Sequence, residues 1–87
     1  MGPVKCKDDG EEVIRSIFQD KEKRIFIADK NGFVRIYAPK GSLIGYLKKN
    51  GNISKTRIPF GANVYSMLQD SHGILWLGTK PNGLFRL

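Results

Sequence analysis

The stretch IRSIFQD at residues 14–20 returns 50 positions later as VYSMLQD at residues 64–70. The correspondence continues beyond these segments. RIFI at residues 24–27 lies under ILWL at 74–77, and, with one inserted residue, KNGFVRI at 30–36 lies under PNGLFRL at 81–87. Self-similarity near this period is typical of repeat architectures, so the chain is expected to contain one structural unit twice.

The apolar segments are short, rich in β-forming residues and separated by turn residues, which is the pattern of an all-β protein. Strands are expected near residues 13–19, 24–28, 33–37, 43–47, 53–58, 64–69, 74–78 and 84–87. No helix is expected, because no window of a dozen residues has a helical period free of Gly and Pro. Antiparallel four-stranded meanders repeated at this period are propeller blades, so the sequence predicts about two blades, a partial β-propeller. A barrel or a sandwich of eight strands stays open as an alternative.

Turn residues mark the ends of the expected strands. Asp70 and Gly73 occupy the first and fourth places of a type I turn. Asn50 and Gly51 are the residues that a type I′ hairpin turn needs, since both must adopt positive φ. Asp20 and Asp70 could be a carboxylate pair for hydrolysis, but their equivalent places in the two repeats indicate that each fixes a turn.

The expected organisation has three parts. Residues 1–12 have no periodicity and are expected to be a flexible lead-in, residues 13–62 a first, degenerate blade, and residues 63–87 a second, incomplete blade. Radial closure of a propeller typically takes four to eight blades. We therefore expect the remaining blades of a longer parent protein as partners. Alternatives are a ring of several chains or a homo-oligomer through sheet edges.

Composition excludes several classes of function. The net charge is +7, and residues 30–87 contain nine Lys and Arg against Asp70 alone. The basic residues are scattered singly without a nucleic-acid-binding signature, so a solvated positive face is favoured over a nucleic-acid partner. No apolar stretch is long enough to span a bilayer. Cys6 and His72 lack further ligands at metal-binding spacing, and no nucleophile–base set is recognisable, so no metal, no cofactor and no enzymatic activity are expected.

The second repeat carries a family signature. Asn63 to Thr79 read NVYSMLQDSHGILWLGT, and NGLFRL follows at residues 82–87. This closely resembles the two-component regulator propeller repeat, with its Asp, Gly, Trp and Gly-Thr at the expected spacing. Residues 13–36 match more loosely, because Lys23 replaces the turn glycine and Phe26 replaces the tryptophan. Phe26 and Trp76 are expected to wedge between neighbouring blades.

The resemblance implies a function. Such repeats occur in arrays in the periplasmic sensor halves of hybrid two-component histidine kinases, especially in gut Bacteroidetes. Ligand binding there, often of glycan breakdown products, changes signalling to the kinase. The resemblance thus implies a non-catalytic, periplasmic sensor segment with a possible glycan ligand. Open alternatives are a two-blade, lectin-like carbohydrate-binding module that forms a ring by oligomerisation, and a small basic nucleic-acid-binding barrel.

Propeller geometry suggests where a ligand would bind. The loop before each innermost strand and the loop between the next two strands share one face of a propeller. In this chain those loops are residues 59–63, 29–31 and 80–82. Their polar side chains are the candidate ligand-binding residues, namely Lys30, Asn31, Asn63, Lys80 and Asn82.

Overall fold

The computed structural model describes residues 13–87, and the predictions for residues 1–12, including Cys6, lie outside this range. The strands are β1 (Ile14–Gln19), β2 (Ile25–Asp29), β3 (Val34–Tyr37), β4 (Leu43–Leu47), β5 (Ile53–Ser54), β6 (Asn63–Gln69), β7 (Leu75–Lys80) and β8 (Gly83–Arg86). The described part of the chain contains no helix, so the all-β prediction is confirmed and no helix there could cross a membrane.

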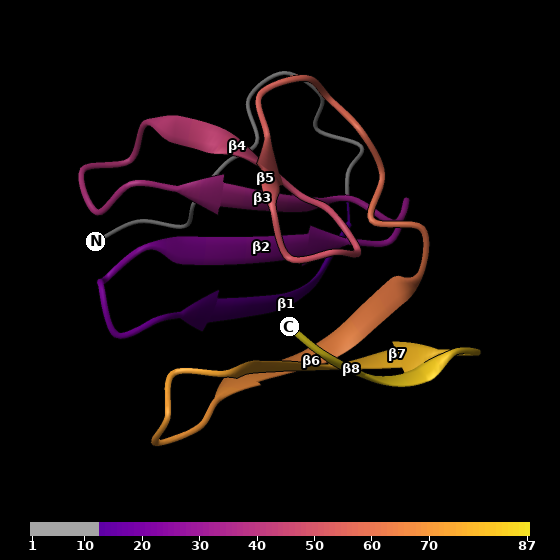
Figure 1. Ribbon diagram of the computed structural model, residues 1–87. Helices are drawn as coiled ribbons and strands as arrows, with labels where there is room; N and C mark the ends of the chain where they lie inside the picture. The colour runs from indigo at the N-terminus through magenta and orange to yellow at the C-terminus, as the bar shows by residue number, and fades with distance from the viewer. Residues whose placement is uncertain (1–12) are drawn as a thin grey trace.

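The strands form two antiparallel sheets that lie one above the other (Figure 1). The first sheet has the order β1-β2-β3-β4-β5 and the second has the order β6-β7-β8. Each sheet is a meander in which every strand pairs with the next along the chain. Two packed meanders of this kind agree with the predicted partial propeller.

The strand expected at residues 53–58 is much shorter than predicted. Only Ile53 and Ser54 pair with β4, and residues 55–62 form the linker between the sheets. The Ser54 hydroxyl accepts a hydrogen bond from the Thr56 backbone N–H at 3.1 Å, which turns the chain away from β4. The fifth strand of the first sheet is thus present but has only two residues.

Five of the hairpin turns in the described residues share one geometry, and they begin at Asp20, Asp29, Ala38, Lys48 and Asp70. In each, the fourth residue of the turn donates its backbone N–H to the carbonyl of the first and has a positive φ, as at Gly73, whose N–H lies 3.0 Å from the Asp70 oxygen. The β7–β8 turn differs and contains a cis Lys80–Pro81 peptide bond. Gly51 follows the same pattern with a φ of 91°, whereas Asn50 has no positive φ, so the type I′ prediction is wrong. Lys23 adopts a φ of 69° where the second repeat has glycine, because the shared turn requires that conformation.

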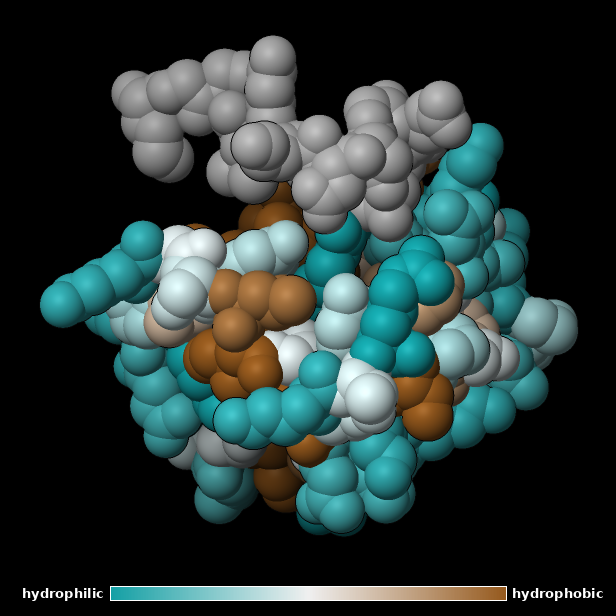
Figure 2. Space-filling view, turned by 90° about the horizontal axis from the view of Figure 1, so that it is seen from above, coloured by the Kyte–Doolittle hydropathy of each residue, from teal (hydrophilic) through white to brown (hydrophobic). Residues whose placement is uncertain are grey.

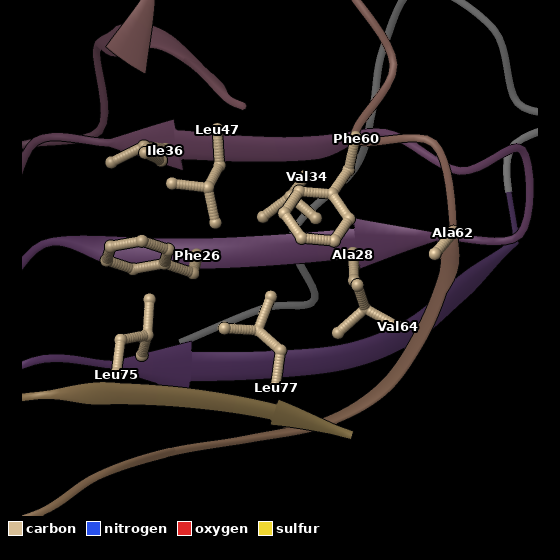
Figure 3. Packing of buried hydrophobic residues seen from close by; sticks show 10 residues of the cluster. All are labelled: Phe26, Ala28, Val34, Ile36, Leu47, Phe60, Ala62, Val64, Leu75 and Leu77. Atoms are coloured by element: carbon tan, nitrogen blue, oxygen red, sulfur yellow. The ribbon is translucent and has the colours of Figure 1, made fainter. Parts of the chain in front are cut away.

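Apolar side chains from both sheets and from the linker make one core (Figure 3). The first sheet contributes Phe26, Ala28, Val34, Ile36 and Leu47, the linker Phe60 and Ala62, and the second sheet Val64, Leu75 and Leu77. The Phe60 ring is 1% exposed and meets the Phe85 ring edge to face at 5.3 Å between centroids. Full burial of such a side chain stabilises a fold by about 1.5–3 kcal/mol, so the linker is part of the core.

The pairing register shows how the two repeats correspond in space. Phe26 pairs with Ile36 and Trp76 pairs with Arg86, so the third strands are also related by 50 residues. The one-residue insertion assumed from the sequence is therefore wrong for the strands, and the Asn-Gly pair has instead shifted by one position within the turn.

Phe26 and Trp76 differ in their surroundings although their positions correspond. Phe26 points at the second sheet and is buried in the core, as predicted. Since neighbouring strand residues point to opposite faces, the buried Leu75 and Leu77 place Trp76 on the far face of the second sheet. Trp76 therefore does not lie between the two sheets, and its packing against a further blade on the outer face stays a prediction.

The outer surface seen from above the first sheet is mostly hydrophilic, with small separate apolar areas between charged and polar residues (Figure 2). Scattered apolar side chains of this kind are normal for a protein surface.

Candidate ligand-binding site

A concavity lies at the end of the molecule where the β2–β3 turn, the linker and the β7–β8 turn meet. Its volume is about 270 Å³. Its lining residues are Asn31, Gly32, Pro59, Gly61, Ala62, Asn63, Lys80 and Pro81. These residues come from three segments that are far apart in the sequence, so only the packing of the two sheets brings them together.

Hydrogen bonds hold the two turns in shape and join the linker to the β2–β3 turn. The Asp29 carboxylate accepts the backbone N–H of Asn31 at 2.9 Å and that of Phe33 at 3.1 Å, which holds the β2–β3 turn. The Phe60 N–H donates to the Gly32 carbonyl at 2.7 Å and ties the linker to this turn. On the opposite side, the Thr79 hydroxyl donates to the Gly83 carbonyl at 2.7 Å across the β7–β8 turn.

Three of the five candidate residues line this concavity. They are Asn31, Asn63 and Lys80. Lys30 and Asn82 are exposed in the same turns but are not among its lining residues. The five residues thus lie at one end of the molecule, and three of them share a surface that a small ligand could contact.

Two further residues stand beside this concavity and were not among the candidates. Arg15 and Tyr65 are each the extra residue of a β-bulge, because the β1–β2 register shifts between Ile14 and Ser16 and the β6–β7 register shifts between Val64 and Ser66. The Arg15 guanidinium lies 4.7 Å from the centre of the Tyr65 ring, and the Lys80 ammonium lies 5.5 Å from it. Their 50-residue spacing was visible in the sequence, but the bulges that turn them outward were not.

A second cavity of about 160 Å³ lies between the sheets, near the opposite end of the strands. Its charged lining residues are Asp20 and Arg24, whose carboxylate and guanidinium groups form an ion pair at 2.7 Å. The remaining lining is mostly apolar and belongs to the core, including Phe26, Ile36 and Leu75. Asp20 and Arg24 neutralise each other, and Asp20 also accepts the backbone hydrogen bonds of its own turn. These two charged residues therefore have a structural role, and we do not assign a ligand to this cavity.

The arrangement provides binding groups without recognisable reactive ones. Residues 13–87 contain no group of three or more His, Cys, Asp and Glu placed to hold a metal ion. His72 is exposed in the β6–β7 turn. The Asn amides can donate and accept hydrogen bonds, and Lys80 adds a positive charge.

Two packed antiparallel repeat units, with their first strands β1 and β6 side by side, define the protein as part of a β-propeller. The family model described as two component regulator propeller matches residues 58–80, which confirms the resemblance found in the second repeat. A search of curated proteins and a search of solved structures found no match to the chain.

Proposed function

We propose that the chain is a non-catalytic, ligand-binding propeller segment from the sensor protein of a hybrid two-component system. In this proposal the segment lies in the periplasm, its ligand is a glycan fragment, and binding is signalled to a histidine kinase. The family match over residues 58–80 supports the regulator class. The observation that carries ligand binding is the convergence of Asn31, Asn63 and Lys80 in one concavity.

The chemistry of the lining supports binding over catalysis. No Asp, Glu, His, Cys or Ser is among the lining residues of the concavity, so Lys80 has no acid or base partner among them. An acid–base or nucleophilic mechanism needs such groups within hydrogen-bonding distance of a substrate. Sugar hydroxyls, in contrast, are recognised by amide and ammonium groups of the kind present here.

An NMR titration of the ¹⁵N-labelled chain tests this function. The sugars to be added are glucose, galactose, mannose, xylose and glucuronate. We expect at least one sugar to shift the side-chain amide signals of Asn31 and Asn63. The Asn63→Ala variant should bind that sugar about tenfold more weakly, since a hydrogen bond in a binding site is worth roughly 1 kcal/mol or more. Gln19→Ala, an exposed amide at the far end of β1, is the matched control. Shifts confined to residues outside the concavity, or none with any sugar, would contradict the proposal.

The outer face of the second sheet supports a further sheet as partner. Leu68 and Leu84 are 59% and 66% exposed and lie on the same face as Trp76. By the 50-residue register they correspond to Phe18 and Val34, on the face of the first sheet that the second sheet covers. The next repeat of the parent protein would cover the outer face in the same way.

A second copy of the chain could instead cover this face, as in the lectin-like ring. Sedimentation velocity in dilute solution distinguishes the two arrangements. A stable ring of two or three chains would favour the lectin-like module. A monomer or a polydisperse mixture would favour the segment of a longer sensor.

A further inference from the structure

We infer that the ligand of this concavity carries a negatively charged group, a carboxylate or a sulfate, held between Arg15 and Lys80 beside Tyr65. The inference rests on the proposed binding function and adds the chemical class of the ligand. Three observations support it: the positions of the two bulges, the absence of an acidic partner for Arg15 and Lys80 among residues 13–87, and the position of Lys80 in the concavity.

The two bulges build the charged part of the site. β1 and β6 are the first strands and edge strands of their sheets, and they run close to each other (Figure 1). Each bulge adds one residue at the same position of the repeat, and these residues are Arg15 and Tyr65. Bulges re-aim a side chain relative to the regular strand. Here they place an arginine and a tyrosine in contact at the junction of the two repeats.

The Tyr65 ring contacts two cationic side chains, Arg15 and Lys80, but does not neutralise their charge. The Arg15 and Lys80 groups lie 4.7 Å and 5.5 Å from the same ring centre, so they can be no farther apart than the sum of these distances. A ring attracts a cation through its quadrupole but carries no net charge. Like charges repel more strongly the closer they lie, and an anion that contacts both groups would offset their repulsion.

No carboxylate of the described residues fills that role. The ion pairs among residues 13–87 involve Arg24 and Arg35, and neither Arg15 nor Lys80 takes part in one. Asp29 is the acidic residue of the adjacent turn. One of its oxygens accepts two backbone N–H groups and the other lies 3.6 Å from the Arg35 guanidinium. Its charge is thus directed to the turn and to Arg35.

Lys80 joins the charged cluster to the concavity. It lines the concavity with Asn31 and Asn63 and lies near Tyr65 at the same time. A ligand that places its anionic group at Arg15 and Lys80 can therefore place neutral hydroxyls at the two amides. A small acidic sugar, such as a uronate or a sulfated monosaccharide, combines both kinds of group.

Isothermal titration calorimetry of the 87-residue chain at low salt tests this inference with glucuronate, glucose and inorganic sulfate as probes. We expect glucuronate to bind at least about tenfold more tightly than glucose, because charge-assisted hydrogen bonds are roughly twice as strong as neutral ones. Arg15→Gln and Lys80→Gln should each weaken glucuronate binding about tenfold, and added salt should weaken it in the wild type. Lys40→Gln is the matched control, since it removes the same charge from the β3–β4 turn at the other end of the sheet.

The outcomes separate the inference from the function on which it rests. Equal binding of glucose and glucuronate, with no effect of Lys80→Gln beyond that of Lys40→Gln, would overturn the anionic class and leave sugar binding in place. Failure of all three probes to bind would overturn the inference, and the NMR titration with the other sugars would then decide the function. Sulfate that binds as tightly as glucuronate and competes with it would support the anion site and assign it to free anions.

Discussion

Asp20 and Asp70 hold equivalent turns, and each uses one carboxylate oxygen to accept two backbone N–H groups. In the second repeat the other oxygen accepts the Trp76 indole N–H at 3.0 Å. In the first repeat the residue at that place is Phe26, which has no donor, and the Arg24 side chain supplies it instead at 2.7 Å. The degenerate first repeat has thus lost the tryptophan without leaving its turn carboxylate unsatisfied.

This arrangement predicts how Trp76 affects Asp70. The indole hydrogen bond, followed by those of the Ile74 and His72 backbone, lowers the pKa of Asp70 below its usual 3.8. A lowered pKa gives stability that is present above pH 3.8 and is lost as the pH falls through the lowered value. Trp76→Phe removes the donor, so the pKa of Asp70 should rise toward 3.8 and the loss of stability on acidification should become smaller. Carboxyl ¹³C NMR titration measures the pKa, with Tyr65→Phe as the aromatic control. An unchanged pKa in Trp76→Phe would refute the assignment.

At the scale of elements, the first sheet depends on a close approach between β4 and β5. A Cβ added to Gly45 would meet the Ile53 methyl at 2.7 Å and would also collide with the Ser54 carbonyl oxygen. Backbone cannot move aside as a flexible side-chain end can. The two-residue β5 is held by only a short ladder with β4, so it is the element with the least to oppose such a collision.

We therefore expect Gly45→Ala to displace β5 and to lower the free energy of unfolding by about 1–3 kcal/mol, the usual cost of overpacking. Hydrogen exchange should increase at Ile53 and Ser54, and urea unfolding should give the loss of stability. Ser42→Ala, an exposed position just before the same strand, should change stability by less than about 0.5 kcal/mol. If Gly45→Ala matched that control, the close approach would not matter for stability.

On the scale of the whole molecule, the two sheets stabilise each other across a single core. Leu77 of β7 is 0% exposed and points at the first sheet, whereas Leu84 of β8 is 66% exposed on the outer face. The linker closes the same core through Phe60 and Ala62. Because the sheets share this buried surface, they are expected to unfold together.

Leu77→Ala should lower the free energy of unfolding by about 2–5 kcal/mol through the cavity that it leaves. Leu84→Ala makes the same change on the outer face and should cost much less than this. Urea unfolding monitored by circular dichroism measures both, and Ile36→Val, with an expected loss of about 0.5–1.5 kcal/mol, keeps a core effect measurable if Leu77→Ala does not fold. Two separate transitions in the wild type, or equal losses for the two leucine variants, would show that the sheets are independent.

The sequence alone determined the local features of this protein. The repeat of short apolar segments between Asp, Asn and Gly residues set the strands and the turns at Asp20 and Asp70, because these depend on neighbours a few positions away. The prediction from sequence was wrong where local signals compete. At residues 55–58 the hydrogen bond to the Ser54 hydroxyl ends the strand, and at Asn50 the hairpin turn is not of type I′.

Only the tertiary structure decided which residues meet. The loops of Asn31, Asn63 and Lys80 were expected on one face from propeller geometry, but their shared concavity depends on the packing of two sheets. The cluster of Arg15 and Tyr65 depends on two bulges, which are set by pairing with the next strand. The different surroundings of Phe26 and Trp76 have the same origin, since equal positions in a repeat are buried only where another sheet covers them.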